Sequence, residues 1–366
     1  QVAHIIMALA MALHFIIGKV VWERWWSWAG LFVAYATIVN FTVYTKYTDP
    51  HSAISAFYYI FNFFVWLHLI DLALRKGMNH FLRNIELIMW ILLGGELALV
   101  VTGLGRMFGS SRSMGTFNDP NQMAHFILWL VICLGAIGWV LHRSWKYGIF
   151  AWCMGTIATA YSASRSGALG LLFVGLIYVL MGLKKGSAII LGKLNLGQKD
   201  ILFTIFALIL FLSFIAILYY GKIEPSVDGL TKQFSYWISR FQDSSRNTSL
   251  EGRGYDRLWK FPDYLILGAG EGASERWAGR TWFLGEIHST FAGVIFYYGL
   301  PGILFLSFFL YNLWVRLDDL WMKLLFLAPL FYSVGTYNLR NWFFWIGLSI
   351  LYIASRHQRY KLIDQK

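Results

Sequence analysis

His288 is the residue in this sequence best suited to acid–base chemistry. An unperturbed histidine titrates at about pH 6.5 and can take a proton from a hydroxyl group as that group attacks a substrate. Glu286, two residues earlier, could orient the imidazole ring or tune its pKa. His4, His51 and His125 are alternatives, and a lone histidine serves more often as a satisfied polar residue than as a base.

Arginines are the second group of residues with chemical potential. A guanidinium binds phosphate oxygens in a fork. Two arginines lie in the polar motif Arg253-Gly-Tyr-Asp-Arg257, and Arg112 and Arg165 lie in short segments between apolar runs. An arginine near hydrocarbon is costly unless it has a partner, and Arg165 stands between serines and a glycine, which favours phosphate binding over snorkelling to the membrane interface. For Arg106 and Arg340 the two interpretations are evenly balanced.

Helix N-termini could add to such an anion site. In Gly115-Thr-Phe-Asn-Asp-Pro-Asn-Gln122, Asn118 or Asp119 can cap a helix whose first residue is Pro120. Arg165 begins a second helix, and His288-Ser-Thr290 begins a third. Three helix N-termini at one face could hold an anion through their free amides, although ordinary capping accounts for each one taken singly.

Carboxylates offer a different chemistry. Asp49, Asp256, Glu271 and Glu275 could bind a metal or act as a base, but the sequence has no tight acidic cluster such as Asp-x-Asp, which argues against a metal site. Glu96 falls inside an apolar run, where a carboxylate is costly. It is therefore either a functional residue or the partner of an arginine on a neighbouring helix.

The elements that position these residues are membrane helices. The chain is 58% hydrophobic and 14% charged, whereas a soluble domain carries roughly 25% charged residues. Runs of about 20 apolar residues span a bilayer, so we predict an all-α polytopic membrane protein of about 11–12 transmembrane helices. The predicted spans are 2–22, 26–45, 53–74, 84–104, 121–141, 147–163, 166–183, 201–221, 302–316, 322–338 and 341–355, and a stretch near 288–298 enters the membrane partway.

The distribution of basic residues predicts the topology. Lysines crowd the connection between 183 and 201, at Lys184, Lys185, Lys193 and Lys199. Cytoplasmic loops carry an excess of Lys and Arg, so this connection is placed in the cytoplasm and the long polar loop outside it. The expected domains are an N-terminal bundle (1–221), an extracytoplasmic loop with short helices (222–301), and C-terminal helices with a cytoplasmic tail (302–366).

Three smaller expectations accompany this topology. Residue 1 falls outside the cytoplasm, so we expect one further helix before it. The apolar positions of 230–241 recur at helical spacing and predict a helix on the outer membrane surface or on the loop's own core. The net charge of +12 suggests a nucleic acid, but its placement in short loops is typical of a membrane protein, and we expect no nucleic-acid partner.

Several of these motifs, in this order, resemble the O-antigen ligase and polymerase family over about residues 105–315. The motifs are Arg112-Ser-Met-Gly-Thr-Phe-Asn-Asp-Pro-Asn-Gln122, Ser164-Arg165-Ser-Gly167, Arg253 to Arg257, Gly268-Ala-Gly-Glu-Gly272, and His288 followed by Tyr298-Gly-Leu-Pro-Gly302. The family often has His-Asn where this chain has His288-Ser289, so no role passes to an asparagine there.

The resemblance implies a GT-C-like glycosyltransferase of the bacterial inner membrane, with its active site on the periplasmic face and no cofactor or metal. It implies an inverting transfer of a glycan from undecaprenyl pyrophosphate. The expected catalytic residues are His288 as the base, Arg257 and Arg253. The expected pyrophosphate site is Arg165, Arg112, Asn118 and Asn121, and the expected supporting residues are Glu286, Glu96 and Arg280.

Four functions remain open. A surface-polysaccharide polymerase would join lipid-linked repeats, and a ligase would move the finished glycan onto lipid A-core. A protein O-oligosaccharyltransferase would use a protein acceptor. A transporter would place charges in similar positions, but transporters usually show internal repeats and broken helices, and no repeat is visible. The expected partners are the lipid-linked glycan, its acceptor and membrane lipids.

Overall fold

The structure is a computed structural model that describes residues 2–18, 21–109, 112–190 and 249–363. It is mostly helical (78%), and in the described ranges six helices are long and apolar enough to cross a membrane. These are Arg24–Tyr47, Pro50–Lys76, Met78–Val101, Pro120–His142, Arg165–Gly182 and Thr290–Arg316. The prediction of a mostly helical membrane protein is confirmed by the helix content and by these six helices.

Each predicted span that falls in the described ranges coincides with at least part of a helix. The helices are α1 (Val2–Ile17), α2 (Ser27–Tyr47), α3 (Pro50–Lys76), α4 (Met78–Val101), α5 (Pro120–His142), α6 (Lys146–Ser162), α7 (Arg165–Ile190), α12 (Thr290–Arg316), α13 (Leu320–Gly335) and α14 (Trp342–Ile363). The predicted span at 201–221 and the predicted surface helix at 230–241 lie outside the described residues.

The chain divides into two compact units, which are described separately. The first unit contains Gln1–Phe81, Ser245–Leu317 and Ser333–Arg356, and the second contains Leu82–Ser244, Asp318–Tyr332 and His357–Lys366.

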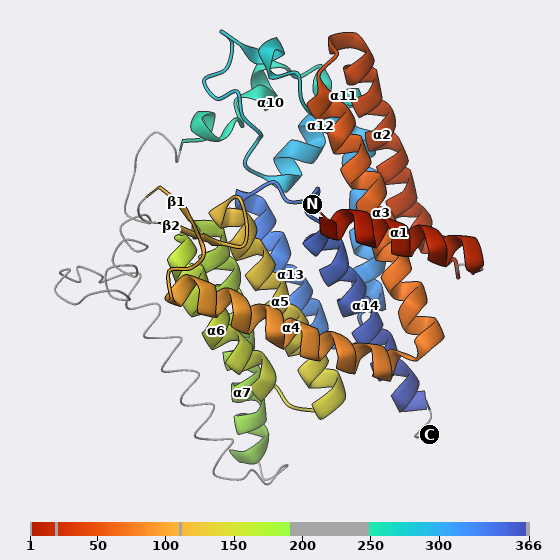
Figure 1. Cartoon of the computed structure of the whole chain (residues 1–366), viewed down its shortest axis with the longest axis vertical. Coiled ribbons are helices and arrows are strands. Elements are labelled where there is room, and N and C mark those ends of the chain that lie inside the picture. Colours follow the sequence, from red (N-terminus) through yellow and green to blue (C-terminus); the bar gives the residue numbers. More distant parts are fainter. Residues whose placement is uncertain (1, 19–20, 110–111, 191–248, 364–366) are drawn as a thin grey trace, which may run out of the picture. The chain divides into compact units, whose positions relative to one another are not determined.

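The core of the first unit is aromatic. Trp25 precedes α2, and its ring contacts those of Trp66 on α3, Phe309 on α12 and Tyr352 on α14, with centroids 5.7, 6.0 and 5.3 Å away. These rings join the start of α2 to the later parts of the other helices. The opposite end of the unit, where α2 ends and α3 and α12 begin, is covered by short helices of the segment 249–289 (Figure 1). These are α10 (Arg257–Lys260), α11 (Tyr264–Leu267) and the 3-10 turns Glu251–Arg253 and Ser274–Trp277.

A break in α12 corrects the predicted boundary there. The stretch near 288–298, expected to enter the membrane partway, and the span expected at 302–316 belong to one helix with non-helical backbone at Gly299 (φ 57°, ψ −161°). Pro301 has no N–H to donate to the carbonyl of Tyr297. That carbonyl accepts instead from the N–H of Gly270, at 2.8 Å, so the break is satisfied by the glycine turn 268–272.

The glycine turn 268–272 needs its glycines for both conformation and space. Gly268, Gly270 and Gly272 all have positive φ, at 93°, 68° and 78°, a region that costs other residues energy. A Cβ on Gly270 would lie 2.4 Å from Val43 on α2, and one on Gly272 would lie 2.5 Å from Asp49. The turn therefore packs directly on α2 and α3 and fixes the position of Glu271 between its glycines.

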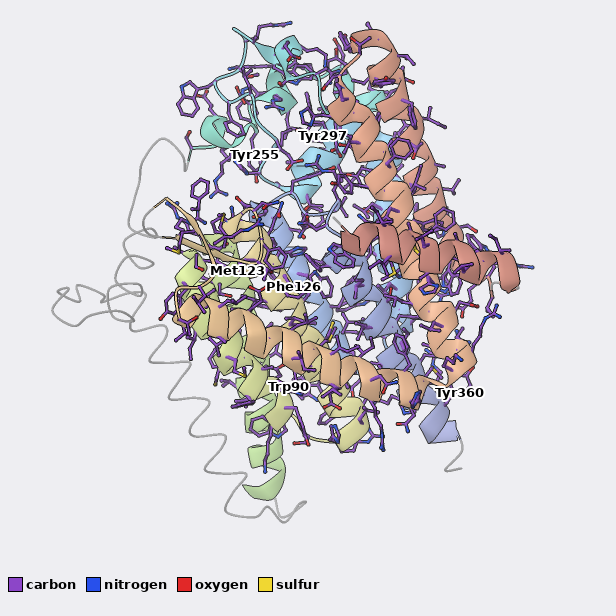
Figure 2. The ribbon with its side chains drawn as sticks, in the orientation of Figure 1. Trp90, Met123, Phe126, Tyr255, Tyr297 and Tyr360 are labelled. Carbon is purple, nitrogen blue, oxygen red and sulfur yellow. The ribbon has the colours of Figure 1, made fainter. Side chains whose placement is uncertain are left out.

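In the second unit, α5, α6 and α7 run as consecutive antiparallel helices and α4 crosses them (Figure 1). The side chains of Met123 and Phe126 on α5 are buried (Figure 2). A short antiparallel hairpin of β1 (Arg106–Phe108) and β2 (Arg112–Gly115) precedes α5. This hairpin was not predicted, since its strands are too short to show a period in the sequence.

Candidate functional site

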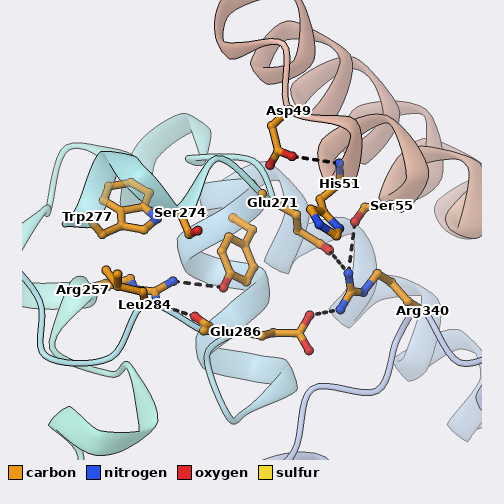
Figure 3. A pocket seen from close by; sticks show the side chains of 13 residues that line it. Asp49, His51, Ser55, Arg257, Glu271, Ser274, Trp277, Leu284, Glu286 and Arg340 are labelled. Atoms are coloured by element: carbon orange, nitrogen blue, oxygen red, sulfur yellow. Dashed lines mark hydrogen bonds and ion pairs between the residues drawn. The ribbon is translucent and has the colours of Figure 1, made fainter. Parts of the chain in front are cut away.

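A cavity of about 290 Å³, lined mostly by polar and charged residues, lies within the first unit, between the start of α3 and the segment 249–289 (Figure 3). This volume is at the lower end of the range for ligand pockets. The cavity is lined by Asp49, His51, Ser55, Arg257, Glu271, Gly272, Ser274, Trp277, Leu284, Gly285, Glu286, Tyr297 and Arg340. It is called the pocket below.

Two carboxylates share one arginine at the pocket. Arg340, in the connection between α13 and α14, places Nη1 3.1 Å from Glu271 Oε2, and its Nη2 binds Glu286 Oε1. Arg340 Nη1 also donates to Ser55 Oγ at 3.1 Å, and the Arg340 carbonyl accepts from Asn62 on α3. The guanidinium is thus held by α3 and by both carboxylates.

Glu271 is the buried member of this pair, with only 3% of its surface exposed. Its Oε1 accepts from the hydroxyls of Tyr59, Tyr298 and Tyr337, at 2.7, 2.5 and 2.7 Å. Burial by itself would raise the pKa of Glu271, but Arg340 and the three hydroxyls outweigh burial and hold this pKa below its usual range. Glu271 is therefore a fixed anion that secures Arg340.

Glu286 differs from Glu271 because its side chain is 35% exposed and lines the pocket. Loss of hydration raises the pKa of Glu286 to about 7, and repulsion from Glu271 adds to this, while Arg340 and Arg257 partly offset it. A carboxyl group with such a pKa can exchange a proton at neutral pH.

Arg257 forms another wall of the pocket and is almost fully buried, at 1% exposed. Its Nη2 donates to the carbonyl of Phe283 at 2.7 Å and to that of Gly285, and Nη1 donates to the hydroxyl of Tyr297 at 3.4 Å. No carboxylate of the described residues forms an ion pair with Arg257. A buried cation with neutral partners favours an anionic ligand in the adjoining cavity.

The start of α3 completes the pocket. Asp49 is the N-cap of α3 and accepts from the N–H of His51 at 3.1 Å, as well as from the N–H of Ala273. The carboxylate thus joins the first turn of α3 to the residue after the glycine turn, and its oxygens are used in these backbone contacts. His51 is exposed and lines the pocket.

His288, the predicted base, does not line the pocket. It lies just before α12, and its ring faces that of Phe283 with centroids 5.1 Å apart. Its N–H donates to the carbonyl of Arg253 at 3.0 Å, and its carbonyl accepts from Tyr255 at 3.3 Å. These bonds fix the backbone of His288, and its role as the base stays a prediction.

Two further predicted residues of the loop, Arg253 and Arg280, also lie outside the pocket lining. Arg253 is half-buried, and its carbonyl receives His288. Arg280 is exposed and stacks on Phe261, with its guanidinium carbon 4.5 Å from the ring centroid. Of the three loop arginines that the sequence indicated, the pocket contains Arg257.

Several predicted pyrophosphate-binding residues meet in the second unit. Arg112 Nε donates to the carbonyl of Ser162 at 2.9 Å, and its Nη2 lies 3.4 Å from Asn121 Oδ1. Ser164 donates to the same Asn121 oxygen at 3.0 Å, immediately before Arg165 at the start of α7. The structure therefore brings Arg112, Asn121 and the start of α7 together, and their role in pyrophosphate binding stays a prediction.

Capping at the start of α5 is as predicted. Asp119 is the N-cap, accepting from the N–H groups of Asn121 and Gln122 at 2.7 and 3.2 Å, with Pro120 as the first helical residue. Asn118 instead accepts from Arg106, at 2.5 Å. Asp119 therefore serves as the cap that the start of α5 requires.

Glu96 binds the end of the hairpin in the second unit. Its carboxylate accepts from the N–H of Thr116 at 3.3 Å and from the Thr116 hydroxyl, and only 5% of the residue is exposed. Within the described ranges no arginine forms an ion pair with it. Thr116 thus takes the place of the arginine partner that the sequence left open.

For Arg340 the sequence left two interpretations open, and the tyrosines around Glu271 were not predicted. The sequence did carry signals for Glu271 and for Tyr298. Glu271 stands between glycines of positive φ in a motif already singled out, and Tyr298 begins the motif at the break in α12. A carboxylate held in so constrained a turn is a stronger candidate than one in an ordinary loop.

No group of three or more His, Cys, Asp and Glu side chains in the described ranges is placed to hold a metal ion. Comparison of the chain with models of known protein families gave no match, and comparison with curated proteins gave none either.

Proposed function

We propose that this protein is an extracytoplasmic glycosyltransferase of the bacterial inner membrane that moves a glycan from an undecaprenyl-pyrophosphate donor to an acceptor hydroxyl. The proposed product is a surface polysaccharide of the O-antigen type, which the enzyme extends by polymerisation. The observation that supports this proposal is that the buried guanidinium of Arg257 and the half-exposed carboxylate of Glu286 line the same pocket.

The two groups suit the two ends of such a reaction. Glycosyl transfer from a lipid pyrophosphate releases an anionic leaving group, and Arg257 would stabilise the charge that develops on it. The acceptor hydroxyl must lose a proton, and the segment 286–288 carries two candidates for the base, Glu286 and His288. The reaction would be a single inverting displacement at the anomeric carbon.

The distribution of charge supports an outward-facing pocket. The pocket lies at the end of the first unit where α2 ends and α3 begins. The opposite end of that unit carries the basic residues Arg24, Arg75, Lys76, Arg316 and Arg356. Cytoplasmic ends of membrane helices are rich in Lys and Arg, so this end would face the cytoplasm and the pocket the periplasm.

The proposal is tested with purified protein and a short undecaprenyl-pyrophosphate glycan, while the acceptor is varied. Products that lengthen by whole repeats support the polymerase, and transfer to lipid A-core alone would identify a ligase. Transfer to a protein acceptor would identify an oligosaccharyltransferase. If no acceptor yields product or free undecaprenyl pyrophosphate, and vesicles instead accumulate the glycan, the enzyme proposal fails in favour of a transporter.

A further inference from the structure

Glu286 and Glu271 contact the same arginine but are differently exposed. Glu271 has one oxygen surrounded by three tyrosine hydroxyls and the other beside Arg340. Glu286 uses Oε1 for Arg340, while its Oε2 makes no hydrogen bond within the described part of the chain. The free oxygen belongs to a half-exposed side chain that lines the cavity.

The charges around Arg340 leave Glu286 under-compensated. One guanidinium serves two carboxylates, and Glu271 holds it from a fully enclosed position. A second carboxylate beside a cation that is already paired is stabilised less by that cation. The affinity of this second carboxylate for a proton therefore rises. This is the electrostatic arrangement of a base that works near neutral pH.

Asp49 and Tyr297 also face the pocket, but their side-chain oxygens already contact other groups of the protein. Asp49 uses its oxygens to cap α3 and to bind Ala273, and the Tyr297 hydroxyl contacts Arg257 and Ile287. His51 is an exposed residue of the first turn of α3. His288 does not line the cavity, and its ring faces Phe283.

We propose that Glu286 is the catalytic base, that its free Oε2 takes the proton of the acceptor hydroxyl, and that Arg340 and Glu271 are positioning residues that hold the carboxylate in place. The assignment rests on the proposed glycosyl transfer. It replaces His288 in that role.

The acceptor oxygen forms a bond to the anomeric carbon as its proton passes to Glu286 Oε2. The bond between that carbon and the phosphate oxygen breaks, and its electron pair leaves on the pyrophosphate beside Arg257. Figure 3 shows Arg257 at one side of the pocket and Arg340, with Glu286 bound to it, at the other. Leaving group and acceptor would therefore approach from different sides of the cavity, as an inverting displacement requires.

The assignment is tested by comparing Glu286→Gln with His288→Ala in the full-length protein. Glu286→Gln keeps the shape of the side chain but removes the base, and its turnover should fall by about 10²–10⁴-fold while donor binding is retained. His288→Ala should keep most of the wild-type turnover. Glu251→Gln is the matched control, because Glu251 is an exposed glutamate of the same loop segment and lies outside the pocket lining.

The pH dependence gives a second readout. Wild-type kcat/KM should fall below about pH 7 as Glu286 is protonated, and Glu286→Gln should lack this acidic limb. Wild-type turnover retained in Glu286→Gln, or a loss of turnover in His288→Ala alone, would overturn the assignment and leave the proposed function standing. An inactive wild type with every donor and acceptor would instead defeat the proposed function.

Discussion

Arg340 lies 3.1 Å from Glu271 Oε2, and this ion pair joins the connection after α13 to the glycine turn 268–272. Glu271 is one of the most enclosed carboxylates in the first unit, and Arg340 is the cation that allows it to stay ionised there. The same guanidinium extends to Glu286 in the pocket. The ion pair therefore sets the charge that Glu286 experiences.

Replacing Glu271 by glutamine tests this relationship. The negative charge of Glu271 raises the pKa of Glu286, and its removal also leaves Arg340 to Glu286 alone. The pKa of Glu286 should fall, and the acidic limb of kcat/KM should move to lower pH. A pH–rate profile that is unchanged in a folded Glu271→Gln protein would show that the two carboxylates are not coupled.

Thermal stability offers a test of Glu286 that needs no substrate. Its pKa is about 7 in the folded protein, raised from about 4.5, so between these values the folded state binds more protons than the unfolded state. Stability from this group is fully present below about pH 4.5 and is lost as the pH rises through 7. The midpoint of unfolding in detergent should therefore decrease from pH 5.5 to pH 8.

Glu286→Gln removes that contribution and should flatten the same decrease, whereas Glu251→Gln should not. The quantity compared is the difference between the unfolding midpoints at pH 5.5 and pH 8 within each variant. A loss of stability that is equal at both pH values, such as that from the lost contact with Arg340, cancels in this difference. A decrease as steep in Glu286→Gln as in the wild type would contradict the raised pKa.

The break in α12 predicts an unequal response of two glycines to alanine. Gly299 and Gly279 both have positive φ, at 57° and 73°, but a Cβ on Gly299 would lie 2.4 Å from the carbonyl oxygen of Ile266, while one on Gly279 meets nothing within 4 Å. Gly299→Ala should destabilise the protein by roughly 2–5 kcal/mol, from strain and overlap together. Gly279→Ala should cost about 1–2 kcal/mol, from strain alone.

Thermal unfolding of the two variants in the same detergent measures the difference. Equal losses would mean that the contact between the break and α11 is not tight. A larger loss in Gly299→Ala would identify the motif Tyr298-Gly-Leu-Pro-Gly302 as the structural support of the glycine turn that carries Glu271.

Local features of the sequence were sufficient to predict the helices and one cap. Apolar runs of membrane length stand out from a polar background, and the described spans follow them. Asp119 before Pro120 predicted the start of α5 because capping depends on neighbouring residues alone. The break at Gly299 was predicted as the boundary between two separate segments, because a proline motif next to an apolar run also fits the end of a polar loop.

The site was less predictable because its contacts join distant parts of the chain. Arg340 and Glu286 are 54 residues apart, and Tyr59 and Glu271 are 212 residues apart. The hydrophobic periodicity of a sequence carries no information about contacts between residues so far apart. Arg257 was selected through the resemblance of the motif Arg253 to Arg257 to a known family, whereas Glu286 was expected to orient or tune His288 and instead binds Arg340.

The proposed function depends most directly on Arg257. The measurement is the release of undecaprenyl pyrophosphate from a lipid-linked glycan by purified wild type, Arg257→Lys and Arg83→Lys, with unfolding followed in parallel. Lysine keeps the charge but loses the fork, so release by Arg257→Lys should fall by about 10²–10³-fold. Arg83→Lys, at an exposed position on α4, should match the wild type. Release by a folded Arg257→Lys protein at the wild-type rate would contradict the account.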